Sequence, residues 1–110
     1  PRFENLVALH LRKLVDVWSD LGLGDFDLHY VRDKDKREVD FLVTEGRRPW
    51  LLVEAKLSDG TPAPALRYFL ERMAPVHGAV QIVRQPASDR IVRHEKGLVV
   101  VPAVLALAAM

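Results

Sequence analysis

The chain of 110 residues has the size of a single domain, and its 49% hydrophobic and 28% charged residues are typical of a globular protein rather than a disordered or fibrous one. It contains no cysteine, which excludes disulfides and thiolate metal sites and suits a reducing, cytoplasmic location. The net charge of +1 is too small to identify a nucleic-acid-binding protein by charge alone.

Residues 3–18 are predicted to form an amphipathic helix. Its apolar residues recur at helical spacing, at Phe3, Leu6, Val7, Leu11, Leu14, Val17 and Trp18. No proline interrupts this stretch, and Gly22 and Gly24 after it are residues that end helices. Asp25 then begins a turn.

Three strands separated by two polar turns follow the helix. The strands are expected at 26–32, 38–44 and 50–56, and the turns at 33–36 and 45–49. The second strand alternates, so we expect Val39, Phe41 and Val43 to share one side of it. Strands joined by such short turns are predicted to form an antiparallel meander.

The second half of the chain predicts a helix, further strands and a short terminal helix. A loop at 57–61, with Ser58, Asp59 and Gly60, leads to Pro62 and Pro64, where a helix can begin. The expected elements are a helix at 65–73 ended by Pro75, strands at 78–84, 91–94 and 98–101, and a helix at 103–109 opened by Pro102. A helix between the third and fourth strands allows a parallel crossover, so the prediction is an α/β domain with an αβββαβ core and a mixed sheet.

Two carboxylates interrupt the apolar strands. Asp40 lies between Val39 and Phe41, and Glu54 ends the apolar run 50–53. If the hairpin is centred on Arg47, the register pairs Thr44 with Trp50, Leu42 with Leu52, and Asp40 with Glu54. Facing carboxylates repel each other unless a divalent cation lies between them, and hard oxygen ligands suit Mg²⁺ or Mn²⁺.

Lys56 points to the same strand face as Glu54, because residues i and i+2 do so in a strand. It could orient an attacking water or offset charge on a phosphate. Alternatively, it only pairs with Glu54 or Asp40 at the strand end. Spacing alone leaves both interpretations open.

Asp40 on the second strand and Glu54-Ala55-Lys56 on the third resemble the motif of the PD-(D/E)XK nuclease superfamily, although Val39 stands where that motif usually has proline. The resemblance implies a restriction-endonuclease-like fold and DNA as substrate. It also implies a metal ion held by Asp40, Glu54 and the carbonyl of Ala55, with Lys56 assisting hydrolysis.

A closer resemblance, to the C-terminal domain of a family of prokaryotic AAA-type ATPases, covers nearly the whole chain. It lies in residues 3–8, 30–35, 37–41, 53–56 and 99–102. The chain has no P-loop motif and begins at Pro1. The resemblance therefore implies that residues 1–110 are a C-terminal fragment, with an ATPase module upstream in the full-length protein.

The remaining candidates have two interpretations each. Glu4 fills the place of an acidic helix residue that the nuclease superfamily adds to its metal site, or is a first-turn glutamate favoured by the helix dipole. Gln81 either reaches the site or is a plain strand residue. His10 is expected to be packed, and His29, His77 and His94 lack the spacing of zinc ligands.

The same ambiguity applies to the whole domain. Residues 1–60 carry a net charge of −2 and residues 61–110 one of +3, so the second half could face phosphates or simply be solvated. Six arginines could contact phosphate: Arg32, Arg37, Arg47, Arg48, Arg67 and Arg72. The leading hypothesis is a Mg²⁺-dependent nuclease acting on DNA, and the alternative is a non-catalytic module that binds DNA or a partner protein for the attached ATPase.

Overall fold

Helix α1 spans Arg2–Asp20 in the computed structural model, which describes residues 2–58, 61–73, 76–86 and 89–109. The predicted apolar stripe turns one helix face inward, and Phe3, Val7, Leu11 and Val15 are buried along it at intervals of four residues. Gly22 follows with a φ of +76°, a conformation that glycine adopts without steric cost. The helix therefore ends where the glycines predict.

One six-stranded mixed sheet forms the centre of the fold, in the order β1-β2-β3-β4-β6-β5. Its strands are β1 (Phe26–Arg32), β2 (Glu38–Glu45), β3 (Arg48–Lys56), β4 (Gly78–Val83), β5 (Val92–Arg93) and β6 (Leu98–Pro102). Helix α2 (Pro64–Arg72), a 3₁₀ turn (Glu95–Gly97) and helix α3 (Ala103–Ala109) complete the elements. Strand β3 runs parallel to β4, and β4 parallel to β6, whereas β1, β2 and β5 pair antiparallel. The predicted α/β class, the αβββαβ order and the mixed sheet are confirmed.

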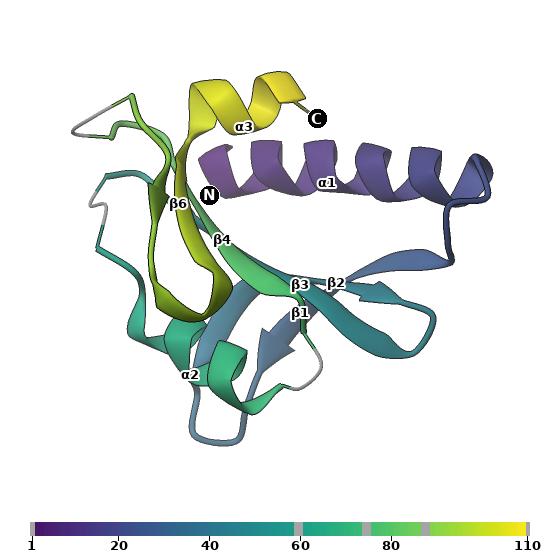
Figure 1. The fold of residues 1–110 in the computed structure, drawn as a ribbon, viewed down its shortest axis with the longest axis horizontal. Coiled ribbons are helices and arrows are strands. Elements are labelled where there is room, and N and C mark those ends of the chain that lie inside the picture. The colour runs from purple at the N-terminus through teal and green to yellow at the C-terminus, as the bar shows by residue number, and fades with distance from the viewer. Residues whose placement is uncertain (1, 59–60, 74–75, 87–88, 110) are drawn as a thin grey trace.

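Helices cover both faces of the sheet (Figure 1). Helices α1 and α3 lie on one face, where they enclose a cluster of Phe3, Val7, Leu11, Phe41, Val53, Ile82 and Ala103. Helix α2 lies on the other, where Ala63, Leu66 and Phe69 pack against the sheet residues Val39, Leu42, Leu52, Ala79, Val83, Leu98 and Val100. The two clusters explain the apolar runs of β3 and β4, whose residues are buried on both sides.

Leu66 tests the packing of α2 against the sheet. Its side chain is fully buried, with 0% exposed. Leu66→Ala is expected to lower the free energy of unfolding by about 2–5 kcal/mol, since it removes buried methyl groups and leaves a cavity. Leu21→Ala, at a leucine that is 68% exposed, is the matched control and should change it by less than about 0.5 kcal/mol. Urea denaturation measures both, and similar losses would contradict this packing.

Strand β2 departs from regular alternation. His29 pairs with Leu42 and Val31 with Val39, so β2 has two residues, Asp40 and Phe41, where β1 has one. This β-bulge reverses the alternation, so Val39 packs under α2 while Phe41 packs under α1. The prediction that Val39 and Phe41 share one side is wrong for this reason.

The β2–β3 turn is tighter than predicted. Only Gly46 and Arg47 form it, because Gly46 takes a φ of +59°. Thr44 pairs with Pro49, not with Trp50, which is an extra residue in β3. The Trp50 ring instead packs against the rings of Trp18 and Phe26, with centroids 5.6 and 5.2 Å away. The predicted pairing of Leu42 with Leu52 is confirmed.

The other predicted boundaries shift by a few residues. The small strand expected at 91–94 is reduced to Val92–Arg93, and α2 ends at Arg72. The turn residues Asp59 and Gly60 and the expected helix stop Pro75 lie outside the described residues. Among the helices that the structure describes, none is long and apolar enough to cross a membrane.

Candidate functional site

Strands β2 and β3 separate at the carboxylates. The ladder between them runs from the turn to the pair Phe41 and Val53. Continuing this register by one residue brings Asp40 opposite Glu54, as predicted, but no backbone pairing is formed there. Beyond this point β2 pairs with β1 alone, and β3 pairs with β4. The antiparallel hairpin therefore opens where the two acidic residues stand.

The carboxylates of Asp40 and Glu54 replace the missing ladder bonds. The backbone N–H of Asp40 donates to Glu54 Oε1 at 2.9 Å, and the backbone N–H of Ala55 donates to Asp40 Oδ2 at 2.8 Å. Each carboxylate thus accepts a hydrogen bond from the opposite strand, which satisfies a donor that the opening would otherwise leave unpaired. The predicted proximity of the two acidic side chains is confirmed.

Glu54 is buried, with 7% of its surface exposed. Burial raises the pKa of its carboxyl from 4.5 to about 7, and repulsion from Asp40 adds to this, whereas the hydrogen bond from the Asp40 N–H and the charge of Lys56 oppose it. Lys56 Nζ lies 3.8 Å from Glu54 Oε2, and the lysine side chain is 42% exposed. A half-exposed lysine at that distance offsets only part of the negative charge of the pair.

This arrangement of donor atoms fits a divalent cation. Among the described residues, the two backbone donors occupy Asp40 Oδ2 and Glu54 Oε1, which leaves Asp40 Oδ1 and Glu54 Oε2 without a backbone donor, and Glu54 Oε2 makes a long contact with Lys56. In a strand the N–H and C=O of one residue point to the same edge, so the Ala55 carbonyl is directed into the opening with its N–H. Two carboxylates and a carbonyl are oxygen ligands of the kind that Mg²⁺ and Mn²⁺ prefer, with waters filling the remaining positions.

Glu4 lies on the same hollow as Asp40 but does not complete a three-carboxylate cluster. The hollow has a volume of about 240 Å³ and is lined by Glu4, Tyr30, Val31, Arg32, Glu38, Val39 and Asp40. Within the described parts of the chain, no three His, Asp or Glu side chains lie close enough together to hold a metal ion. Asp40 is thus shared between this hollow and the pair with Glu54.

Gln81 lies beside the site, but its side chain has a structural role. From strand β4 it pairs in register with Glu54 of the neighbouring strand β3, and it is fully buried, with 0% exposed. Its Oε1 accepts the N–H of Ala63 at 2.8 Å, and its Nε2 donates to the carbonyl of Thr61 at 2.9 Å. Gln81 therefore holds the segment that leads into α2 against the sheet. A glutamine within an otherwise apolar strand is the sequence signal for such an anchor.

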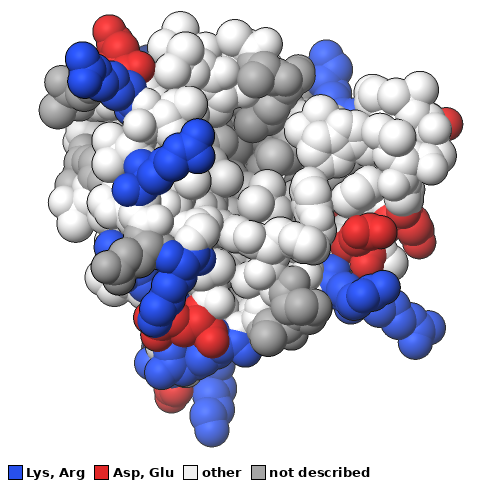
Figure 2. Space-filling model, in the orientation of Figure 1, with Lys and Arg blue, Asp and Glu red and all other residues white. Residues whose placement is uncertain are grey.

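Of the other predicted candidates, Arg32 lines the hollow of Asp40, whereas His10 and His29 make contacts elsewhere. His10 Nδ1 lies 2.9 Å from the Leu6 carbonyl within α1, and His29 lies 4.0 Å from Asp27 at the surface. Several arginines are paired: Arg32 with Glu38, and Arg37 with Asp33 and Asp35. Figure 2 shows the same mixture on one face of the molecule, where blue side chains stand beside red ones at the rim.

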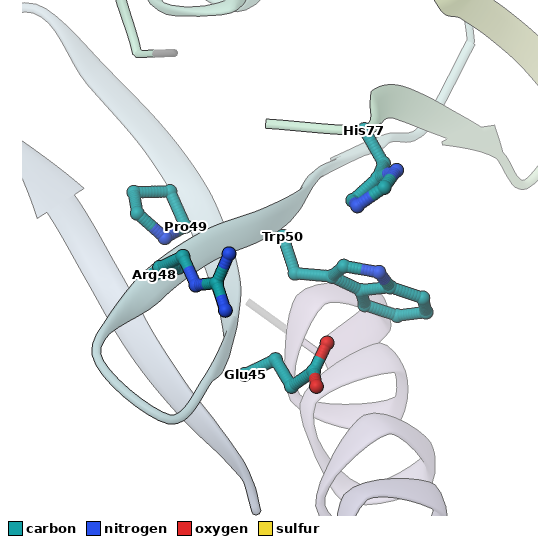
Figure 3. Close-up of a pocket in the computed structure, with 5 residues that line it drawn as sticks. All are labelled: Glu45, Arg48, Pro49, Trp50 and His77. Carbon is teal, nitrogen blue, oxygen red and sulfur yellow. The ribbon is translucent and has the colours of Figure 1, made fainter. Parts of the chain in front are cut away.

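A second hollow lies at the other end of β3. It measures about 80 Å³ and is lined by Glu45, Arg48, Pro49, Trp50 and His77. Figure 3 shows the Trp50 and His77 rings side by side there, with centroids 6.2 Å apart. Trp50 is near the start of the strand that carries Glu54 and Lys56 near its end, so this hollow is separate from the carboxylate pair.

The comparison with known families covers almost all of the chain. Residues 2–105 match the family described as "Domain of unknown function (DUF4143)". The chain belongs to the DUF4143 family. No curated protein and no solved structure matches it. The family description assigns no activity, so the function of this DUF4143 domain has to be inferred from its own side chains.

Proposed function

We propose that this domain is a Mg²⁺- or Mn²⁺-dependent nuclease of the PD-(D/E)XK type that hydrolyses phosphodiester bonds in DNA. The observation that carries the proposal is the buried Glu54 carboxyl beside Asp40, in the opening between β2 and β3, with Lys56 next to it. The αβββαβ order supports it, because Asp40 stands on the second strand and Glu54-Ala55-Lys56 on the third, as in that superfamily.

The acidic side chains themselves argue for a cation. Asn and Gln would accept the same two backbone hydrogen bonds without placing two negative charges side by side. A buried Glu54 carboxylate beside the half-buried Asp40 costs stability unless a positive charge accompanies the pair. A function that needs the charge accounts for Asp40 and Glu54 better than strand pairing alone.

Each residue of the motif has a distinct role in this proposal. Asp40, Glu54 and the carbonyl of Ala55 hold the cation, which polarises a phosphate and acidifies a nearby water when it is bound. Lys56 provides a positive charge where negative charge develops on the phosphate. The hydrogen bonds of Asp40 and Glu54 to the opposite strands keep both carboxylates in place.

The wider context is proposed from the resemblance. DNA is the substrate, and the cytoplasm is the location. In the full-length protein an AAA-type ATPase module precedes this domain and delivers the DNA. Glu4, at the hollow that Asp40 also lines, adds an acidic side chain from α1 beside this site.

A non-catalytic module that binds DNA or a partner protein is the second candidate. One observation favours it, namely that both carboxylates already accept backbone hydrogen bonds and so have a structural role. The test is incubation of the domain with single-stranded, duplex and branched DNA in Mg²⁺ or Mn²⁺. Metal-dependent cleavage supports the nuclease. Binding without cleavage on every substrate, also when the ATPase module is present, supports the second candidate.

Metal binding is tested separately from cleavage by thermal unfolding. Mg²⁺ or Mn²⁺ at a hundredfold excess over Kd should stabilise the fold by about 2.7 kcal/mol at pH 8, where Glu54 is ionised. Asp40→Asn should remove this gain, because a neutral amide is a weaker ligand while its oxygen can still accept the Ala55 N–H. Glu45→Asn, at an exposed position in β2, is the control and should keep it. If millimolar Mg²⁺ or Mn²⁺ leaves the melting temperature of the unmodified domain unchanged, the metal site is refuted.

A further inference from the structure

The hollow beside Asp40 contains an aromatic ring that the proposed chemistry does not use. Tyr30 lies in the middle of β1 and is 77% exposed. It stands opposite the bulge formed by Asp40 and Phe41. Its ring packs against the ring of Phe41, with centroids 5.8 Å apart and planes at 41°. Phe41 thus supports the tyrosine ring, and most of the Tyr30 surface remains open to solvent.

The size and charge of the hollow limit what can occupy it. Its volume of about 240 Å³ is below the range of about 300–1,000 Å³ that is usual for drug-sized ligands, so it suits one small group. Arg32 neutralises Glu38 at 3.2 Å, which leaves Glu4 and Asp40 as the acidic part of the lining. A phosphate placed there would be repelled by these two carboxylates. A neutral aromatic ring would not.

We propose that Tyr30 is the stacking face of a subsite for one unpaired nucleobase, which makes single-stranded DNA the substrate class of this domain. The inference rests on the proposed function in taking DNA as the ligand. A nucleobase on Tyr30 would lie beside Asp40, which lines the same hollow. Bases inside a duplex are stacked and paired, so only an unpaired or extruded base can reach this ring.

The edge position of β1 is consistent with this substrate. β1 is the first strand in the sheet order, so β2 is its only neighbour among the described strands. A flexible single strand can pass along this edge and turn one base onto Tyr30. Stacking of a base on an aromatic side chain contributes about 1–3 kcal/mol and depends little on base identity. The subsite therefore predicts preference for single strands without strong sequence preference.

The experiment measures binding rather than cleavage. The domain carrying Lys56→Ala, which is expected to cleave slowly, is titrated in Mg²⁺ with a short oligonucleotide that contains a fluorescent purine analogue. Tyr30→Ala should weaken binding of the single strand roughly 10- to 100-fold and abolish the fluorescence change caused by stacking. Tyr30→Phe keeps the ring and should behave like the parent. Ile91→Ala, at a 48% exposed residue next to the opposite sheet edge, is the control.

The outcomes separate this inference from the nuclease proposal. Equal single-strand affinity of the parent and Tyr30→Ala overturns the subsite, and so does absence of measurable binding by the parent. Tyr30-dependent binding of an arginine-rich peptide, without such binding of DNA, also overturns it and points to a protein partner at the acidic hollow. Tyr30-dependent DNA binding, together with no cleavage by the unmodified domain in Mg²⁺ or Mn²⁺, supports the subsite and refutes the nuclease. Cleavage of DNA by the unmodified domain, together with unchanged single-strand affinity on Tyr30→Ala substitution, supports the nuclease and refutes the subsite.

Discussion

Lys56→Ala is expected to lower the rate of metal-dependent DNA cleavage on the order of 10²–10³-fold, with little change in DNA affinity. The reason is that Lys56 offers its charge where the phosphate becomes more negative in the transition state, so its loss affects kcat more than KM. DNA affinity should instead depend on exposed arginines and fall steeply with salt. Single-turnover cleavage and anisotropy titrations measure the two quantities.

Two further variants make this result specific. Lys13→Ala removes an exposed lysine of α1 and should leave cleavage unchanged, which controls for the loss of one positive charge. Asp40→Asn should abolish cleavage through loss of the cation while its amide oxygen keeps the Ala55 hydrogen bond. Equal cleavage by the unmodified domain and by both site variants would identify a contaminating nuclease. Equal losses in Lys13→Ala and Lys56→Ala would assign Lys56 a general electrostatic role.

The elements of this fold were predictable because local patterns determine them. The helical spacing from Phe3 to Trp18, the glycines after it and the polar turn before Glu38 each favour one local structure. The parallel crossover between β3 and β4 follows from the helix between them, since a short turn cannot join parallel strands. These signals depend on neighbours in sequence, so the fold class was correct.

Bulges and burial were not predictable, because tertiary packing decides them. The bulge at Asp40 and Phe41 puts Val39 under α2 and Phe41 under α1, and no local pattern marks the extra residue. Trp50 is displaced from the hairpin register because Trp18 and Phe26 pack against it.

The candidate site was likewise predictable where local register determines it and not where tertiary packing does. The approach of Asp40 to Glu54 followed from the even register of the hairpin, but the opening of the hairpin at that point did not. The hydrogen bonds of the Gln81 side chain to Thr61 and Ala63 were not predictable either, because they join β4 to a loop about twenty residues earlier in the chain. Tyr30 was part of a family resemblance only, since its place beside Asp40 appears once β1 and β2 are paired.

Glu54 makes the stability of the metal-free domain depend on pH. Its pKa is about 7 in the folded state and 4.5 ordinarily, so the folded protein binds more protons than the unfolded chain between these values. The stability contributed by the protonated carboxyl is therefore fully present below pH 4.5, decreases as the pH rises and is lost above about pH 7. The total loss from this group is on the order of 3 kcal/mol.

Glu54→Gln should remove this pH dependence and make the metal-free domain more stable than the unmodified protein at pH 8, by up to about 3 kcal/mol. Its amide oxygen can accept the Asp40 N–H as Glu54 does, and it carries no buried charge at any pH. Glu45→Gln, at an exposed glutamate of β2, controls for net charge and should keep the slope. Urea denaturation from pH 4 to 9 without metal gives the free energies. A Glu54→Gln variant that loses stability at pH 8 would show that the ionised carboxylate is itself stabilising, and the argument that the pair of acids needs a cation would then fail.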